Sequence, residues 1–122
     1  EAPWQQGPGE IWRVSPRGVA SLVLRGPVPA GISLGPGGKL FFADRHAAKI
    51  FFIGPEGRPA EFSGFTDGDS PRSLAFAPDT PETRRAGIAG DLFVVTVRRA
   101  AWPLNEVLRI SGPFEELVRS HP

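Results

Sequence analysis

The sequence predicts an all-β protein made of repeated antiparallel units, and three observations support this. The chain of 122 residues holds 15 Gly and 14 Pro. Helices do not tolerate that density, because Pro removes a backbone donor and Gly costs about 1 kcal/mol inside a helix. The hydrophobic content of 40% is too high for a disordered chain. Apolar runs of strand length also recur between turn residues.

Composition excludes several classes of function. The 14 basic and 13 acidic residues leave a net charge of +1, which gives no electrostatic case for nucleic acid or an anionic membrane. Cysteine is absent, so the chain has no disulfide framework, thiolate metal site or cysteine nucleophile. No apolar run approaches the roughly 20 residues of a membrane span. The chain begins with Glu1 rather than Met; this suggests processing, excision or truncation, and we expect a secreted or periplasmic location.

A first unit recurs along the chain. The segment Gly9–Gly18 is echoed by Ala48–Gly57 at a spacing of 39 residues. Isoleucine, proline and glycine occupy matching positions in the two segments. A third, weaker copy is Asn105–Gly112. Such agreement of turn and apolar residues at a fixed spacing is typical of a repeat architecture.

A second unit also recurs. The segment Ala30–Asp44 matches Arg72–Pro78 with a shift of 42 residues, and then Gly90–Val95 with a shift of 52. The difference of 52 − 42 places ten extra residues in an inserted loop at 80–89.

Each unit contains strands separated by tight turns. Ile32 and Leu34, like Leu74 and Phe76, alternate with small or polar residues, as in half-buried strands. The runs 40–43 and 92–95 are continuously apolar, which predicts strands buried on both faces. Pro36-Gly37-Gly38 and Pro55-Glu56-Gly57 carry turn signals, because Gly adopts positive φ without steric cost.

A period near 40 residues is the size of a four-stranded propeller blade. We therefore expect one partial propeller domain over 1–122, of two to two and a half blades in an incomplete ring. Its parts are a repeat at 8–47, a second at 48–104 that contains the insert, and the start of a further blade or an edge strand at 105–122. A generic β-sandwich is the alternative. Residues 113–120 fit an outer strand or a helical turn.

The motifs also resemble known propeller families. Gly31–Asp44, followed by Lys49–Gly57, looks like an NHL-type blade, and the continuation to Arg72 is similar to streptogramin B lyase-like propellers. The stretch from Pro81 to Ile110 resembles a blade of the glucose/sorbosone dehydrogenase-like propellers. The senescence-marker/gluconolactonase-like group shares the general pattern. These families close six or seven blades, so the resemblance implies that the chain is a segment of a larger ring.

The loop after the run 40–43 is the first candidate site. In related propellers, loops at one end of the channel supply metal and substrate ligands, and Asp44 and His46 are suitable ligand types. The alternative is that Asp44 caps the turn and His46 is solvated. Asp67 and Asp69 form a second acidic cluster, which could add to a Ca²⁺ or Mg²⁺ site with Asp44 or could simply be a polar turn.

Further positions could contribute to ligand binding. Arg72 follows the acidic cluster, and its guanidinium would suit an anionic ligand. Arg98, Trp102 and Asn105 surround the loop after the run 92–95. They suit a sugar-like or planar ligand by stacking and hydrogen bonding. Trp102 could equally fill the gap between neighbouring blades. No nucleophile constellation is visible, and no catalytic residue is identified.

Three functions therefore compete. The first is a propeller segment that binds a small polar ligand, sugar- or lactone-like, at the channel mouth, with or without a divalent metal. The second is a segment of an enzyme, either a sugar dehydrogenase that is quinone-dependent or a streptogramin lyase-like protein. The third is a non-catalytic scaffold for protein partners. A partial ring exposes apolar faces and strand edges, so we expect the remaining blades of a larger chain, or self-association, to complete it.

Overall fold

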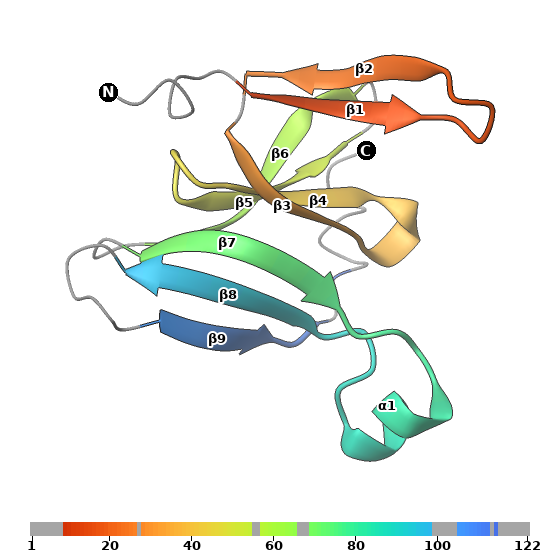
Figure 1. Cartoon of the computed structure of the whole chain (residues 1–122). Coiled ribbons are helices and arrows are strands. Elements are labelled where there is room, and N and C mark those ends of the chain that lie inside the picture. Colours follow the sequence, from red (N-terminus) through yellow and green to blue (C-terminus); the bar gives the residue numbers. More distant parts are fainter. Residues whose placement is uncertain are drawn as a thin grey trace.

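The computed structural model describes residues 9–26, 28–54, 57–65, 69–98, 105–112 and 114, with residues 69, 98 and 105 described by their backbone alone. Over these residues, nine strands form three antiparallel sheets that stack on one another, and one short helix projects from the stack (Figure 1). In this part of the chain, no helix is long and apolar enough to cross a membrane.

The three sheets follow one another along the chain. The first sheet has two strands, β1 (Glu10–Val14) and β2 (Ala20–Arg25). The middle sheet has four strands, β3 (Pro29–Leu34), β4 (Leu40–Asp44), β5 (Lys49–Ile53) and β6 (Pro59–Gly64). The third sheet has three strands, β7 (Asp69–Phe76), β8 (Leu92–Arg98) and β9 (Asn105–Ile110). The predicted fold class is confirmed: the chain is all-β, and its middle sheet has the four antiparallel strands of a propeller blade.

The β3–β4 turn forms where the glycines predict it. Pro36–Gly38 is a single 3₁₀ turn, in which Gly37 and Gly38 have φ values of 68° and 72°. A side chain at either position would be strained, because positive φ brings Cβ close to the backbone. The amide of Gly35 donates to the carbonyl of Lys39 at 2.8 Å, which closes the turn.

The main core lies between the middle and third sheets. The Phe41 ring is fully buried and lies 4.9 Å from Phe76, 5.4 Å from Phe62 and 5.5 Å from Phe52, measured between ring centroids. The buried residues of this cluster are Phe41, Ala43, Ile50, Phe52, Leu74, Leu92, Val94 and Phe114. The two sheets approach closely at Gly31, where an added Cβ would lie 3.0 Å from the carbonyl oxygen of Arg72.

The first sheet packs on the opposite face of the middle sheet (Figure 1). Phe42 is therefore buried on this face, and the run 40–43 is confirmed as a strand covered on both sides. The sequence predicts that Ile32 and Leu34 form the buried side of a half-buried strand. In the structure their exposed fractions are 53% and 68%. Their side chains share a face with Phe42, yet nothing in the described residues covers them. The run 92–95 also differs at Val95, which is 38% exposed on the outer face of the third sheet.

The insert at 80–89, expected as a loop, contains the helix α1 (Pro81–Ala86). Thr80 and Thr83 form a reciprocal capping box, in which the Thr80 hydroxyl accepts from the Thr83 amide and the Thr83 hydroxyl accepts from the Thr80 amide. Pro81 suits the first turn, and Gly87 ends the helix at a φ of 75°. Local capping therefore stabilises a helix that buries no residue of its own.

Candidate functional site

Those predicted polar positions that the structure describes lie at one end of the middle and third sheets, opposite α1 (Figure 1). We call this the turn end, and define it as Asp44–Ala48 with the first residues of β7, 69–72. The Ser70 hydroxyl donates to the carbonyl of Arg45 at 3.0 Å and so joins the two sheets there. The strand pairs 69↔98 and 97↔105 place the backbones of Arg98 and Asn105 at the same end.

Asp44 organises the β4–β5 turn. Its Oδ1 accepts hydrogen bonds from the amides of His46 and Ala47, each at 3.0 Å, and the residue is 8% exposed. Ala48 completes the turn at a φ of 55°. This geometry is that of an aspartate-capped turn, and His46 is exposed to solvent. Asp44 therefore has a structural role whether or not it also binds a ligand.

Arg72 lies in β7 beside β3. Its side chain is half-buried and its Nε is buried. The close approach of Gly31 to its carbonyl oxygen fixes the Arg72 backbone against the middle sheet. Its place in the first half of β7 puts its backbone at the turn end, and its role in binding a ligand stays a prediction.

The remaining predicted positions are only partly described. Asp69, Arg98 and Asn105 are strand residues at the turn end, and the structure describes their backbones but not their side chains. Asp67 and Trp102 lie outside the described residues. Within the described ranges, no three side chains of His, Asp or Glu gather in a group that could hold a metal ion. The predicted Ca²⁺ or Mg²⁺ site stays a prediction.

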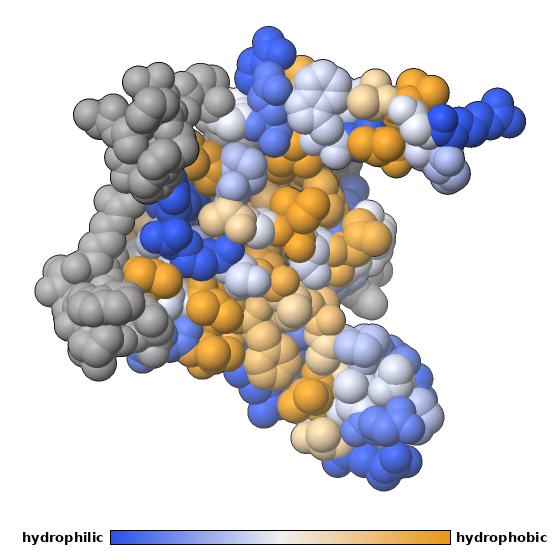
Figure 2. Space-filling model, viewed as in Figure 1, coloured by the Kyte–Doolittle hydropathy of each residue, from blue (hydrophilic) through white to orange (hydrophobic). Residues whose placement is uncertain are grey.

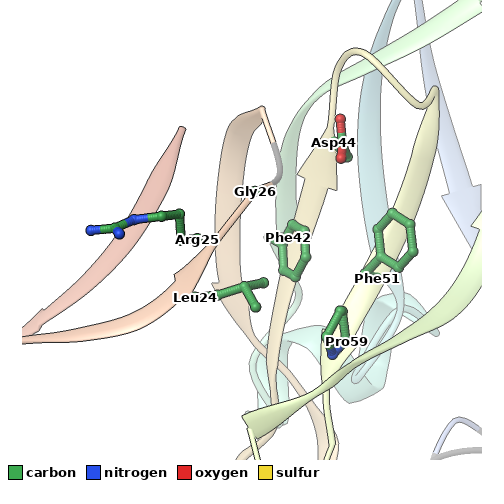
Figure 3. A pocket seen from close by; sticks show the side chains of 7 residues that line it. All are labelled: Leu24, Arg25, Gly26, Phe42, Asp44, Phe51 and Pro59. Carbon is green, nitrogen blue, oxygen red and sulfur yellow. The ribbon is translucent and has the colours of Figure 1, made fainter. Parts of the chain in front are cut away.

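A pocket of about 250 Å³ adjoins Asp44, and no pattern in the sequence indicates it. It lies between the end of β2 and the middle sheet and is mainly apolar (Figure 3). Phe42 and Phe51 stack as a cross-strand pair, with centroids 5.4 Å apart and planes inclined by 18°. Asp44 follows Phe42 along β4, at one end of the pocket. The residues that line it are Leu24, Arg25, Gly26, Phe42, Asp44, Phe51 and Pro59.

Arg25 contributes to the wall of this pocket, but its guanidinium points away (Figure 3). It pairs with Glu10, with Nε and Oε2 2.6 Å apart. The indole of Trp12 donates to the same carboxylate at 3.0 Å. These two partners, the indole first, hold the pKa of Glu10 below its ordinary value. The Arg25 charge is therefore engaged outside the pocket, and Asp44 is the acidic group at the pocket wall.

A larger hollow of about 690 Å³ lies at the opposite end. It separates the β3–β4 turn from α1, and its wall includes the ion pair between Asp79 and Arg84. None of the predicted site residues contributes to it. We therefore take the smaller pocket beside Asp44 as the candidate site, because there an aromatic pair lies beside a buried carboxylate that is itself one of the predicted site residues.

Comparison with known proteins gives one structural likeness. A crystal structure from Thermus thermophilus, provisionally described as an oxidoreductase (glucose dehydrogenase), superimposes with a TM-score of 0.50 at 20% sequence identity. The match covers 70% of this chain and 26% of the other, so the matched region spans about a quarter of that protein. No protein-family model matches the chain, and no curated protein does either. The likeness establishes the fold, which is similar to a section of that larger protein.

Proposed function

We propose that the chain is a section of a β-propeller that binds a small polar ligand, sugar- or lactone-like, in the pocket beside Asp44. The observation that carries the proposal is the pairing of the partly exposed Phe51 ring, which stacks on the buried Phe42, with the carboxylate of Asp44. Aromatic faces bind the apolar face of a sugar ring, and a carboxylate accepts hydrogen bonds from its hydroxyls. A volume of about 250 Å³ lies just below the roughly 300–1,000 Å³ of sites for drug-sized ligands, so it suits a single sugar ring.

The turn end supplies the further groups that such a ligand needs. Asp44 is held by two amide donors, so its carboxylate orientation is set before a ligand arrives. His46 is exposed in the same turn. A divalent cation such as Ca²⁺ or Mg²⁺ could bridge Asp44 to the ligand, because hard cations take carboxylate and hydroxyl oxygens.

The test is titration of the full chain with D-glucose and D-glucono-1,5-lactone, followed by NMR chemical shifts and calorimetry. We expect millimolar affinity with shifts centred on Asp44 and Phe51. Asp44→Asn keeps an oxygen that can accept the two turn amides but removes the charge, and it should weaken binding about tenfold. Arg84→Ala, in the hollow at the opposite end, is the matched control and should change the affinity less than about twofold.

Two outcomes would contradict this function. One is the absence of binding up to about 10 mM, because the expected millimolar affinity corresponds to about −4.1 kcal/mol. The other is an equal loss of affinity in both variants. Parallel titrations with Ca²⁺ and Mg²⁺ test the cation: heat that disappears in Asp44→Asn supports it, and no heat argues against it.

A segment of a sugar-oxidising enzyme is the second candidate, favoured by the likeness to a protein described as a glucose dehydrogenase. The two candidates share a sugar-like ligand, and they differ in turnover. Oxidation of glucose by the chain with an artificial electron acceptor would support the second. Ligand binding without turnover would support the first.

A further inference from the structure

Several large apolar side chains are exposed on surfaces that the repeat would bury. Five of them are Trp12 and Val14 on β1, Ile32 and Leu34 on β3, and Val95 on β8, with exposures between 38% and 68%. Figure 2 shows apolar side chains over the middle of the stack and along the first sheet, whereas the α1 end is hydrophilic. These side chains lie on three different sheets, and exposed apolar surface of this kind marks interaction sites.

The repeat identifies what covers the exposed pair on β3. Ile32 and Leu34 correspond to Leu74 and Phe76 with a shift of 42 residues. Leu74 is only 7% exposed, and Phe76 packs on the core cluster, because β3 and β4 of the preceding sheet lie against β7. The surface around Ile32 therefore fits a hairpin equivalent to β3–β4, which in this chain recurs as β7–β8.

The exposed pair on β1 leads to the same hairpin. β1 reads Glu-Ile-Trp-Arg-Val, and β9 carries Glu-Val-Leu-Arg-Ile 96 residues later. In β9, Leu108 and Ile110 pack on the core cluster, whereas their counterparts Trp12 and Val14 are exposed. β9 pairs with β8. Among the described residues, β1 pairs with β2 alone and leaves its other edge open.

We propose that a second copy of this chain docks through its β7–β8 hairpin, with β8 pairing along the open edge of β1. The β1 strand of the first copy then takes the place of β9 of the second copy. The shared sheet has the strand order β7–β8 from the second copy followed by β1–β2 from the first. The outer face of the hairpin, which includes Val95, then covers Ile32 and Leu34. Trp12 and Val14 pack where Leu108 and Ile110 pack otherwise. One exchange thus covers all five exposed side chains.

Charge complementarity favours this partner. In the third sheet, Arg109 lies with its Nε 2.6 Å from Oδ2 of Asp91, a residue 7% exposed, and its Nη2 donates to the Gly87 carbonyl at 2.7 Å. Arg13 is the β1 counterpart of Arg109 and is exposed. In the exchanged pairing, Arg13 lies opposite Phe93 and meets Asp91. A second copy therefore offers β1 a strand to pair with, β8, and a carboxylate, Asp91, in the position where Arg13 needs a counter-charge.

The exchange has an identifiable competitor, which is β9 itself. Within the described ranges, β9 pairs only with β8, so it is an edge strand that can leave without opening another strand pair. Exchange of an equivalent element between copies is a low-cost route to oligomers. Weakening β9 should therefore promote association, whereas a merely adhesive surface would not respond in this way.

Sedimentation velocity of the full chain over a range of concentrations tests the proposal. We expect reversible association, and Ile32→Glu should weaken it at least about tenfold, since a buried carboxylate without a partner is costly. Val19→Glu is the matched control, because Val19 is 65% exposed but lies in the β1–β2 connection. Arg109→Ala should strengthen association and Arg13→Ala should weaken it. Circular dichroism confirms that each variant is folded.

Disulfide trapping tests the register directly, because the chain has no cysteine of its own. A mixture of Arg13→Cys and Phe93→Cys chains should form the mixed disulfide, since directly opposed residues have Cβ atoms about 4.5–5.5 Å apart. Arg13→Cys with Ser73→Cys, which is exposed on β7, is the control. A monomer at all concentrations, equal effects of Ile32→Glu and Val19→Glu, or equal trapping in both mixtures would overturn the proposal.

Discussion

Gly35 is the position where a single methyl group should disturb the core most. It follows β3 and precedes the 3₁₀ turn, with φ of −122°, which any residue can adopt. A Cβ there would lie 2.6 Å and 2.7 Å from Cε1 and Cδ1 of Phe41, and 2.7 Å from Cε2 of Phe76. The expected effect of Gly35→Ala is therefore steric, and backbone strain makes no contribution.

The magnitude follows from the packing. Carbon atoms in contact lie about 3.5–4.0 Å apart, so each ring must retreat by about 1 Å. Phe41 has no free space to do so, because it is fully buried and bordered by Phe52, Phe62 and Phe76. Overpacking costs about 1–3 kcal/mol, and we expect the upper end. Subtracting up to about 1 kcal/mol for the lower chain entropy of Ala leaves a net loss of about 2 kcal/mol.

Thermal unfolding followed by circular dichroism measures this loss. At about 4–8 °C per kcal/mol for a domain of this order of size, Tm should fall by about 8–16 °C. Gly64→Ala is the matched control, since its Cβ would meet only Cγ of Lys49, at 3.8 Å. It should leave Tm unchanged or slightly raised, because Ala favours a strand more than Gly does. Equal Tm values for the two variants would refute the steric argument.

Three further predictions concern local interactions. Thr83→Val removes the hydroxyl of the capping box, so amide exchange in α1 should rise about fivefold, measured by NMR, while Tm changes little because the helix buries no residue. The hydrogen bond from the Arg84 guanidinium lowers the pKa of Asp79, so Arg84→Ala should raise that pKa, as measured by NMR titration. Because the folded-state pKa is lowered, the stabilisation by this pair is present at neutral pH. It is lost as the pH falls below about 4. Asp44→Ala should destabilise the chain by about 1–3 kcal/mol in urea unfolding, whereas Asp44→Asn should cost less, because an amide oxygen can still accept the turn hydrogen bonds.

Strands and turns could be predicted because their signals are local. The β3–β4 hairpin depends on Gly37 and Gly38 for positive φ and on a continuous apolar run after them, and both are visible in the sequence. The helix α1 also had a local signal, since Thr80 and Thr83 stand in capping-box spacing around Pro81. Its six residues are too few for an apolar periodicity, which is why the repeat pattern predicts only a loop for this segment.

Burial could not be predicted, because it depends on the neighbouring sheet. Leu34 and Phe76 occupy the same position of the repeat, yet Leu34 is exposed and Phe76 packs on Phe41. The pocket beside Asp44 was missed for a related reason. Its wall joins Phe42 to Leu24, and these residues belong to different sheets. The sequence located Asp44 at a strand end but could not decide between a turn cap and a ligand.

The ion pairs on the outer strands stay exposed to water even where a neighbouring sheet packs against their own sheet. Glu10 pairs with Arg25 in the first sheet, and Lys49, which is 39 residues after Glu10, pairs with Glu61 in the middle sheet at 2.7 Å. The Lys49–Glu61 pair keeps side-chain exposures of 42% and 52% although the first sheet already covers this face of the middle sheet. Covering by a neighbouring sheet therefore leaves this outer position in water. By the same geometry, the docked hairpin would bury Ile32 and Leu34 while Glu10 and Arg25 stay solvated, so no charge has to be buried without a partner.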